Sequence, residues 1–440
     1  MTRSHASRRG FLALLGSTAL AGCSGFDPLS EDEQTRVEVS ALREALSEEA
    51  PAVPETVPVD IERSHLERTA ADLRETLSAV PAPFGERDVP NGAIRTELQR
   101  RYDRAETRLD EWTETESPLE ALDRLRYARR SVYSVVGAWE AIESDLTFAD
   151  VRERIPEVRA SFDSFRERWG YVGDDRIRAV LVHATIEELV ARAGGFLARV
   201  PDAERFHSDD VVSVGEFAGR VESARAAVAD AAYLYHRFVA SLSTTRSLGS
   251  VFRDIGESLT ATLESRRESL PPESRDASSF VDRDVEDTPV GGALSDLRRA
   301  IDYADNVDDE RERGQRASVV LSAHWTLARI RAFEFLRERV SNDEYVTVET
   351  VDDARLIRGR TVSAVEDALA SDEHPRLTRH LLRVAEGLDY FPRRLDEYDA
   401  DDTISLEWLA DDLGEYVHIE ATARASVETN ADVADAIRRA

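Results

Sequence analysis

The hydrophobic positions of this chain recur every three or four residues over long stretches. Two runs show the pattern: Leu98, Tyr102, Ala105 and Leu109 in one, and Val132, Val135, Val136 and Trp139 in the other. This spacing places the apolar side chains on one face of an α-helix. The strand-like run, residues 345–348, is too short and isolated to build a sheet. We therefore expect an all-α fold of about twelve helices.

Polar residues at the expected helix starts support this interpretation. Ser117, Pro118 and Glu120 combine a capping serine, a proline in the first turn and a glutamate at the third position. Residues 213–216 repeat the serine and the glutamate without the proline, and residues 147–150 and 350–353 are versions with aspartate. Prolines separate the periodic segments at positions 201, 271, 272 and 289.

Three stretches recur in the same order along the chain, which indicates an internal repeat. Residues 90–94 resemble residues 289–294, Arg130 and Trp139 match Arg316 and Trp325, and residues 209–213 resemble residues 401–405. Amphipathic helices of one biased composition also align by chance, but the serine and glycine cues at helix starts favour duplication. The repeat predicts two similar six-helix bundles, and the groove between them is then the default ligand site.

These patterns divide the chain into four parts. Residues 1–22 form a processing segment, and residues 23–60 are acidic, contain prolines and are expected to act as a tether with one short helix near residues 37–46. Residues 61–245 form the first helical half and residues 246–440 the second.

The N-terminal segment carries a different pattern from the rest of the chain. Arg8 and Arg9 precede an apolar run at residues 14–21, which is followed by Gly22 and Cys23. The segment resembles a twin-arginine signal peptide with a lipobox, as in exported lipoproteins. The resemblance implies cleavage before Cys23, a lipid on its sulfur, and a chain anchored to the membrane on the outer face of the cytoplasmic membrane. The alternative is an uncut N-terminal helix that is buried or crosses the membrane.

The amino-acid composition suggests how the charge of the protein surface is to be interpreted. The chain has 87 acidic and 57 basic residues, a formal charge of −30, no lysine and a single cysteine, Cys23, so no disulfide can form within one molecule. An acid-rich, lysine-free chain with such a signal resembles exported proteins of extreme halophiles. At molar salt the screening length falls to about 3 Å, so the charges would repel one another little. We interpret the charge as an adaptation, and we expect no nucleic-acid partner because no basic patch stands out in the sequence.

Several chemistries are excluded by residue type. Without lysine there is no P-loop and no Schiff base, and without a further cysteine there is no thiolate zinc site. The remaining candidates are histidines near carboxylates. Glu62 with His65, and Glu415 with His418, have the Glu-x-x-His spacing of carboxylate-bridged metal sites, although such pairs also arise by chance in a glutamate-rich chain.

His183 and Glu187 lie four residues apart in the apolar stretch 177–200. This spacing places both on one helical face, where they could bind a metal or form a buried acid–base pair. The more ordinary interpretation is a core histidine hydrogen-bonded to the neighbouring carboxylate. The glycines at 194 and 195 in the same stretch suggest a kink or a close helix contact.

Together these features favour a non-enzymatic binding or assembly module that a lipid on Cys23 holds at the membrane, with a protein partner at the cell surface or a small ligand. The alternative is an exported metal-dependent enzyme or metal-binding protein. The sequence indicates no particular cofactor.

Overall fold

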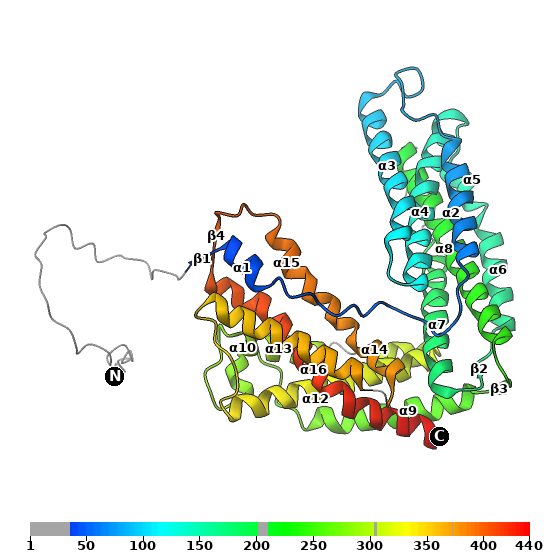
Figure 1. Cartoon of the computed structure of the whole chain (residues 1–440). Helices are drawn as coiled ribbons and strands as arrows, with labels where there is room; N and C mark the ends of the chain where they lie inside the picture. Colours follow the sequence, from blue (N-terminus) through cyan, green and yellow to red (C-terminus); the bar gives the residue numbers. More distant parts are fainter. Residues whose placement is uncertain (1–35, 201–209, 303–305, 372) are drawn as a thin grey trace, which may run out of the picture.

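The computed structural model describes residues 36–200, 210–302, 306–371 and 373–440. The first half contains the helices α2 (Arg63–Ser78), α3 (Gly92–Asp110), α4 (Pro118–Glu143), α5 (Phe148–Arg152), α6 (Ile155–Arg168), α7 (Arg176–Ala198) and α8 (Val211–Ala240). The second half contains α9 (Gly249–Glu268), α10 (Pro289–Asp302), α11 (Asn306–Glu312), α12 (Arg316–Ser341), α13 (Val351–Ala370), α14 (Pro375–Leu382), α15 (Tyr390–Leu395) and α16 (Leu406–Arg439). One more helix, α1 (Val39–Ala45), precedes both halves (Figure 1).

The expected all-α class is confirmed. Twelve of the described helices have eight residues or more, namely α2, α3, α4, α6, α7, α8, α9, α10, α12, α13, α14 and α16. The strands are very short. β1 (Arg36–Glu38) pairs with β4 (Thr403–Ser405), and β2 (Val172–Gly173) pairs with β3 (Arg246–Ser247). None of the described helices is both long enough and apolar enough to cross a bilayer.

The two halves share one order and packing of helices, which confirms the duplicated architecture. In the first half α4 packs along α8, with α2 and α3 against α4 and with α6 and α7 against α8. In the second half α12 packs along α16, with α9 and α10 against α12 and with α13 and α14 against α16. The central helices α4 and α12 are both 26 residues long.

At the level of single residues the repeat is less regular. The similar stretches 90–94 and 289–294 both lie at the start of corresponding helices, α3 and α10. Trp139 lies near the end of α4, whereas Trp325 lies in the first half of α12. The match between these two tryptophans therefore does not reflect equivalent positions.

Most of the expected helix starts are correct, and one is wrong. The Ser117 hydroxyl accepts a hydrogen bond from the backbone N–H of Glu120 at 3.1 Å. Asp150 and Asp353 each accept one from the N–H of a capping threonine at 2.8 Å. Ser213, however, lies inside α8, and Asp210 caps this helix instead. An aspartate earlier in the sequence competes successfully for the same N-terminal N–H groups.

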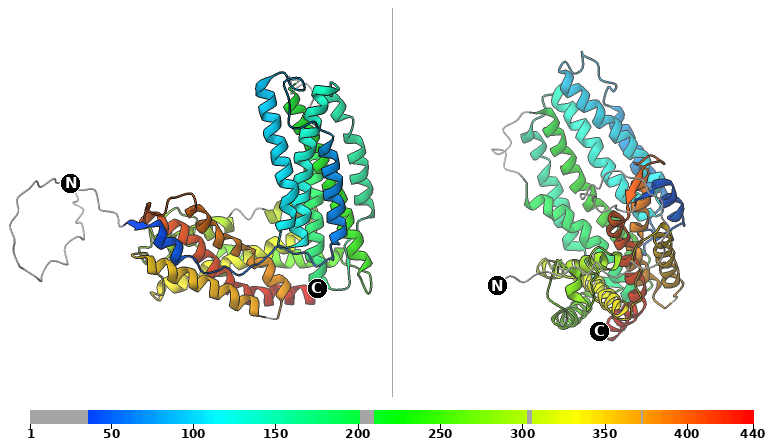
Figure 2. Two further views of the ribbon diagram at one scale, coloured as in Figure 1. Left: turned by 45° about the horizontal axis from the view of Figure 1, so that its top comes forward. Right: turned by 90° about the vertical axis from the view of Figure 1, so that its left-hand side faces the viewer.

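The halves meet at an angle, so the molecule is L-shaped (Figure 2). Helix α7 of the first half packs against α12 of the second half. A single buried cluster includes Val180 and Ile186 from α7 together with Val320 and Phe333 from α12. Of the four buried clusters among the described residues, the largest thus continues from one half into the other.

The expected tether is wrong for residues 36–60, which we call the strap. Val39 and Leu42 of α1 are fully buried, and α1 packs against α13 of the second half. From α1 the strap runs extended across the second half to the start of α2 in the first half (Figure 1). The short helix predicted near residues 37–46 is confirmed, but its apolar face is packed on the protein instead of being held free in solvent.

Three glycines allow α4 and α8 to lie unusually close together. Gly137 of α4 faces Ala218, while Gly215 and Gly219 of α8 face the backbone of α4 around Arg130 and Ser134. A methyl group at position 215 would lie 2.2 Å from the carbonyl oxygen of Ser134. Only glycine fits there, because the obstacle is backbone and cannot rotate away.

Candidate functional site

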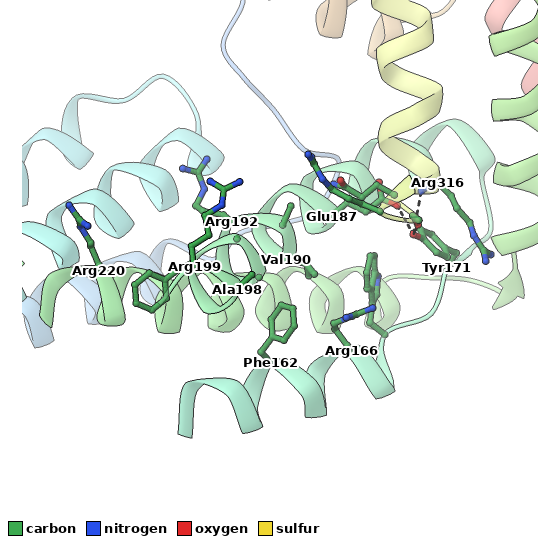
Figure 3. Close-up of a pocket in the computed structure, with 18 of the residues that line it drawn as sticks. Phe162, Arg166, Tyr171, Glu187, Val190, Arg192, Ala198, Arg199, Arg220 and Arg316 are labelled. Carbon is green, nitrogen blue, oxygen red and sulfur yellow. Dashed lines mark hydrogen bonds between the residues drawn. The ribbon is translucent and has the colours of Figure 1, made fainter. Parts of the chain in front are cut away.

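A groove lined by six arginines is the most distinctive cavity of the described chain. Its volume is about 1010 Å³. We call it the arginine groove after its cationic residues, Arg166, Arg192, Arg199, Arg220, Arg313 and Arg316. Figure 3 shows Arg192, Arg199 and Arg220 toward one end, and Arg316 with Tyr171 and Glu187 toward the other.

Three consecutive helices of the first half and one segment of the second half build this groove. Helix α6 contributes Arg166, α7 contributes Arg192 and is followed directly by Arg199, and α8 contributes Arg220. The second half closes one end with residues 313–316, where α12 begins. Gly195 of α7 lies on the groove wall, and a methyl group there would meet no atom within 4 Å. The expected kink or close helix contact therefore does not explain Gly195, whereas its neighbour Gly194 does face Phe162.

The groove reverses the charge balance of the protein. Its lining contains six arginines and one carboxylate, Glu187, whereas the whole chain has 87 acidic and 57 basic residues. Within the described residues Arg166, Arg199 and Arg220 form no ion pair, and all three are exposed. Aromatic side chains share this lining, namely Phe162, Trp169, Tyr171, Phe196 and Phe217. Such a lining suits an anion that also carries a flat or apolar part.

Glu187 is buried at the end of the groove and serves the fold. Its carboxylate accepts hydrogen bonds from the backbone N–H groups of Ala317 at 3.1 Å and Ser318 at 2.6 Å, and from the Tyr171 hydroxyl at 2.5 Å. Ala317 and Ser318 lie in the first turn of α12, whose own N-cap residue offers no side-chain hydrogen bond. A side chain of the first half thus caps a central helix of the second half. Burial raises the pKa of Glu187, and the hydrogen bonds from Ser318 and Tyr171 oppose this.

His183 does not form the expected pair with Glu187. The Trp169 indole N–H donates to His183 Nδ1 at 3.2 Å, and His183 Nε2 lies 2.9 Å from the carbonyl oxygen of Val172. A neutral ring with its proton on Nε2 satisfies both contacts. Burial lowers the pKa of His183 to about 4, which agrees with a neutral core histidine. The histidine is satisfied as expected, but by a tryptophan and a backbone carbonyl instead of a carboxylate.

The pair Glu62 and His65 also has structural partners. Glu62 forms an ion pair with Arg237 at 2.7 Å, and its backbone N–H donates to the Tyr233 hydroxyl at 2.9 Å. The His65 ring stacks on Tyr233 with 3.8 Å between the ring centroids. These contacts fasten the start of α2 to the end of α8.

Glu415 and His418 lie inside α16, where burial lowers the pKa of His418 to about 4 and raises the pKa of Glu415. Among the described residues, no three side chains of histidine, cysteine, aspartate or glutamate come close enough together to hold a metal ion. None of the three predicted metal pairs thus gains a third ligand from the fold. Arg8, Arg9 and Cys23 lie outside the described residues.

A second cavity, of about 670 Å³, lies in the corner between the halves, where the sequence predicts a groove. We call it the corner cavity. Its lining comes from the strap at residues 54–58, from α7, from residues 310–325, and from residues 376–383. It adjoins the arginine groove, because Ala191, Arg313 and Gln315 line both.

Glu310 of the corner cavity makes stability depend on pH. Burial raises its pKa to about 7, and a hydrogen bond from the Ser322 hydroxyl at 2.9 Å opposes this. In the unfolded chain the pKa of this carboxyl group is about 4.5, the ordinary value for glutamate. The folded protein therefore binds one more proton between these two values, so stability falls as pH rises through this window.

We expect Glu310→Gln to weaken this dependence. The melting temperature of the wild type should fall between pH 5 and pH 8 by more than that of Glu310→Gln, because the amide does not titrate. Thermal unfolding followed by circular dichroism in one fixed salt concentration measures the difference. Parallel melting profiles of the two proteins across this range would contradict the assignment.

Comparison with known protein families agrees with the division into halves. Residues 64–244 match DUF8262, and residues 249–435 match DUF8264. Each family is described as a domain of unknown function. The region similar to DUF8262 supplies α6, α7 and α8 of the arginine groove, and the region similar to DUF8264 supplies the residues that close its end. No curated protein and no solved structure matches the chain.

The arginine groove could not be recognised from the sequence. No basic patch stands out when each arginine is considered with its neighbours along the chain, whereas the groove collects arginines from separate helices. One weak signal was present. Residues 189–200 contain Arg192 and Arg199 and no carboxylate, although 87 of the 440 residues are acidic.

Proposed function

We propose that this protein is a lipid-anchored binding protein on the outer face of the cytoplasmic membrane, and that it binds an organic anion in the arginine groove. The N-terminal pattern, with Arg8 and Arg9 before an apolar run and Cys23, supports the location. The ligand class is supported by the lining of the groove, which contains six arginines and one carboxylate. This carboxylate, Glu187, already accepts hydrogen bonds from backbone N–H groups at the start of α12.

Direct contact, not long-range attraction, gives the groove its selectivity in salty surroundings. At molar ionic strength a charge is screened within about 3 Å, so the groove cannot steer anions from a distance. Guanidinium groups still form paired hydrogen bonds to a carboxylate, sulfonate or phosphate that touches them, and such bonds are stronger than neutral ones. The aromatic rings contribute contact with a flat ligand body.

An aromatic sulfonate is a suitable probe of this proposal. We expect 8-anilinonaphthalene-1-sulfonate to bind the folded protein, and the double variant Arg199→Gln/Arg220→Gln to bind it at least about tenfold more weakly, because hydrogen bonds to charged groups contribute about 1.5–3 kcal/mol. A fluorescence titration in constant high salt measures both dissociation constants.

The matched control is Arg104→Gln/Arg275→Gln. Both arginines are exposed, lie outside the groove and form no ion pair within the described residues, so the change of charge is the same. We expect this control to bind like the wild type. Equal weakening in both double variants, or equally tight binding of uncharged N-phenyl-1-naphthylamine, would refute recognition of the anion in the groove.

A further inference from the structure

The corner cavity gathers polar atoms that have no partner in the protein. Fifteen buried side-chain nitrogen or oxygen atoms of the described residues lack a hydrogen bond, and four of them belong to residues that line this cavity. They are Glu310 Oε2, Gln315 Oε1, His380 Nε2 and Arg383 Nε. Buried polar groups without partners destabilise a fold, so a cluster of them beside an open volume indicates a ligand that supplies the missing bonds.

The unpartnered atoms need hydrogen-bond partners of opposite kinds. Gln315 Oε1 accepts hydrogen bonds, and Glu310 Oε2 also does so when the carboxyl group is ionised. Both come from the segment where α11 ends and α12 begins. Arg383 Nε only donates, and Arg383 lies just beyond the end of α14. The exposed Arg379 lies in the last turn of α14 and forms no ion pair within the described chain. One part of the lining thus needs donors and another needs acceptors.

We propose that the corner cavity binds a small zwitterion of the amino-acid class, with its ammonium group on Gln315 and Glu310 and its carboxylate on Arg379 and Arg383. This site is separate from the anion site of the arginine groove, although Gln315 and Arg313 line both cavities. A simple anion would leave the two acceptors without a donor. A sugar would fill all four positions but would leave the charge of Arg379 unneutralised.

Size and enclosure suit such a ligand. The volume of about 670 Å³ admits an amino acid or a short peptide. The strap covers one side, where Glu55 forms an ion pair with Arg383 at 2.8 Å and the carbonyl oxygen of Pro58 accepts a hydrogen bond from Arg178 at 3.0 Å. Neutral His380 adds a flat ring beside Trp325, with 5.8 Å between the ring centroids.

Isothermal titration calorimetry of the full mature chain with the twenty common L-amino acids tests the proposal. We expect at least one of them to bind. Analogues that lack the amine or the carboxylate, such as 4-methylpentanoate and 3-methylbutylamine for leucine, should bind at least about tenfold more weakly, because each loses one charged contact. Failure of all twenty at millimolar concentration, binding of glucose in their place, or equal binding of an analogue would overturn the proposal.

Two variants locate the ligand. Arg379→Gln should weaken binding at least about tenfold by removing a charge-assisted contact. Gln315→Met should do the same while it raises the melting temperature of the ligand-free protein, because it replaces an unpartnered buried acceptor by an apolar group of similar size. Arg275→Gln serves as the control and should bind like the wild type. Unchanged binding in Gln315→Met, or loss of amino-acid binding in Arg199→Gln/Arg220→Gln, would place the ligand elsewhere and overturn this assignment.

Discussion

Gly215→Ala is expected to lower the free energy of unfolding by about 3 kcal/mol or more, because the new methyl group would press against the backbone of α4. The nearest obstacles are the Ser134 carbonyl oxygen at 2.2 Å and the Ala138 nitrogen at 2.7 Å. Neither can move without separating the two central helices of the first half. Alanine otherwise favours a helix over glycine, so helix propensity alone predicts the opposite sign. Urea denaturation followed by circular dichroism measures the change.

The same substitution at Gly195 is the matched control. A methyl group there meets no atom within 4 Å, and Gly195 also lies inside a helix, α7. We expect Gly195→Ala to raise the free energy of unfolding by up to about 1 kcal/mol, because only the gain in helix propensity remains. If both variants changed stability in the same direction, the close approach of α4 and α8 would not be the reason for Gly215.

Glu187→Leu is expected to lower the free energy of unfolding by about 3 kcal/mol, because it leaves buried donors without an acceptor. The backbone N–H groups of Ala317 and Ser318 lose their side-chain partner, while the Tyr171 hydroxyl still has the carbonyl oxygen of Gly314 at 3.1 Å. The lost hydrogen bonds lie at the contact between α7 and α12, so we expect both halves to be destabilised together. Urea denaturation monitored at two wavelengths measures it.

The neighbour of Glu187 in the sequence, Glu188, provides the matched control for this prediction. Glu188 lies on the same helix and pairs with Arg192 at 2.8 Å, but its side chain is 64% exposed. Surface ion pairs contribute about 0–1 kcal/mol, so we expect Glu188→Leu to change stability by no more than that. Comparable losses in the two variants would show that the capping of α12 has no special importance.

Much of the fold could be predicted because local patterns determine it. Helical periodicity and capping residues such as Ser117 and Thr147 act over a few positions, so they are visible in the sequence. The packing of the strap could not be predicted, because it depends on contacts that are distant in the sequence. Its prolines and acidic residues are typical of a linker, and nothing near Leu42 in the sequence shows that α13, about 300 residues later, buries it.

The candidate sites were harder to predict than the helices. His183 and Glu187 stood out because they share a helical face, yet their actual partners, Trp169 and Ser318, come from other segments. The arginine groove and the corner cavity depend on side chains from helices that only the tertiary packing brings together. The spacing of His183 and Glu187 along one helix therefore identified two buried polar residues correctly, but it could not assign their partners.

The pairing of β1 with β4 has a consequence for the order of folding. Arg36 and Thr403 are 367 positions apart, and the Arg36 guanidinium donates to the Thr403 hydroxyl at 2.8 Å. This contact cannot form during synthesis until nearly the whole chain has been made, and α1 has no complete docking surface before then. The last step of folding is thus post-translational. A transport route that carries completed folds would tolerate such a delay, whereas threading the chain through a pore would part the two strands again.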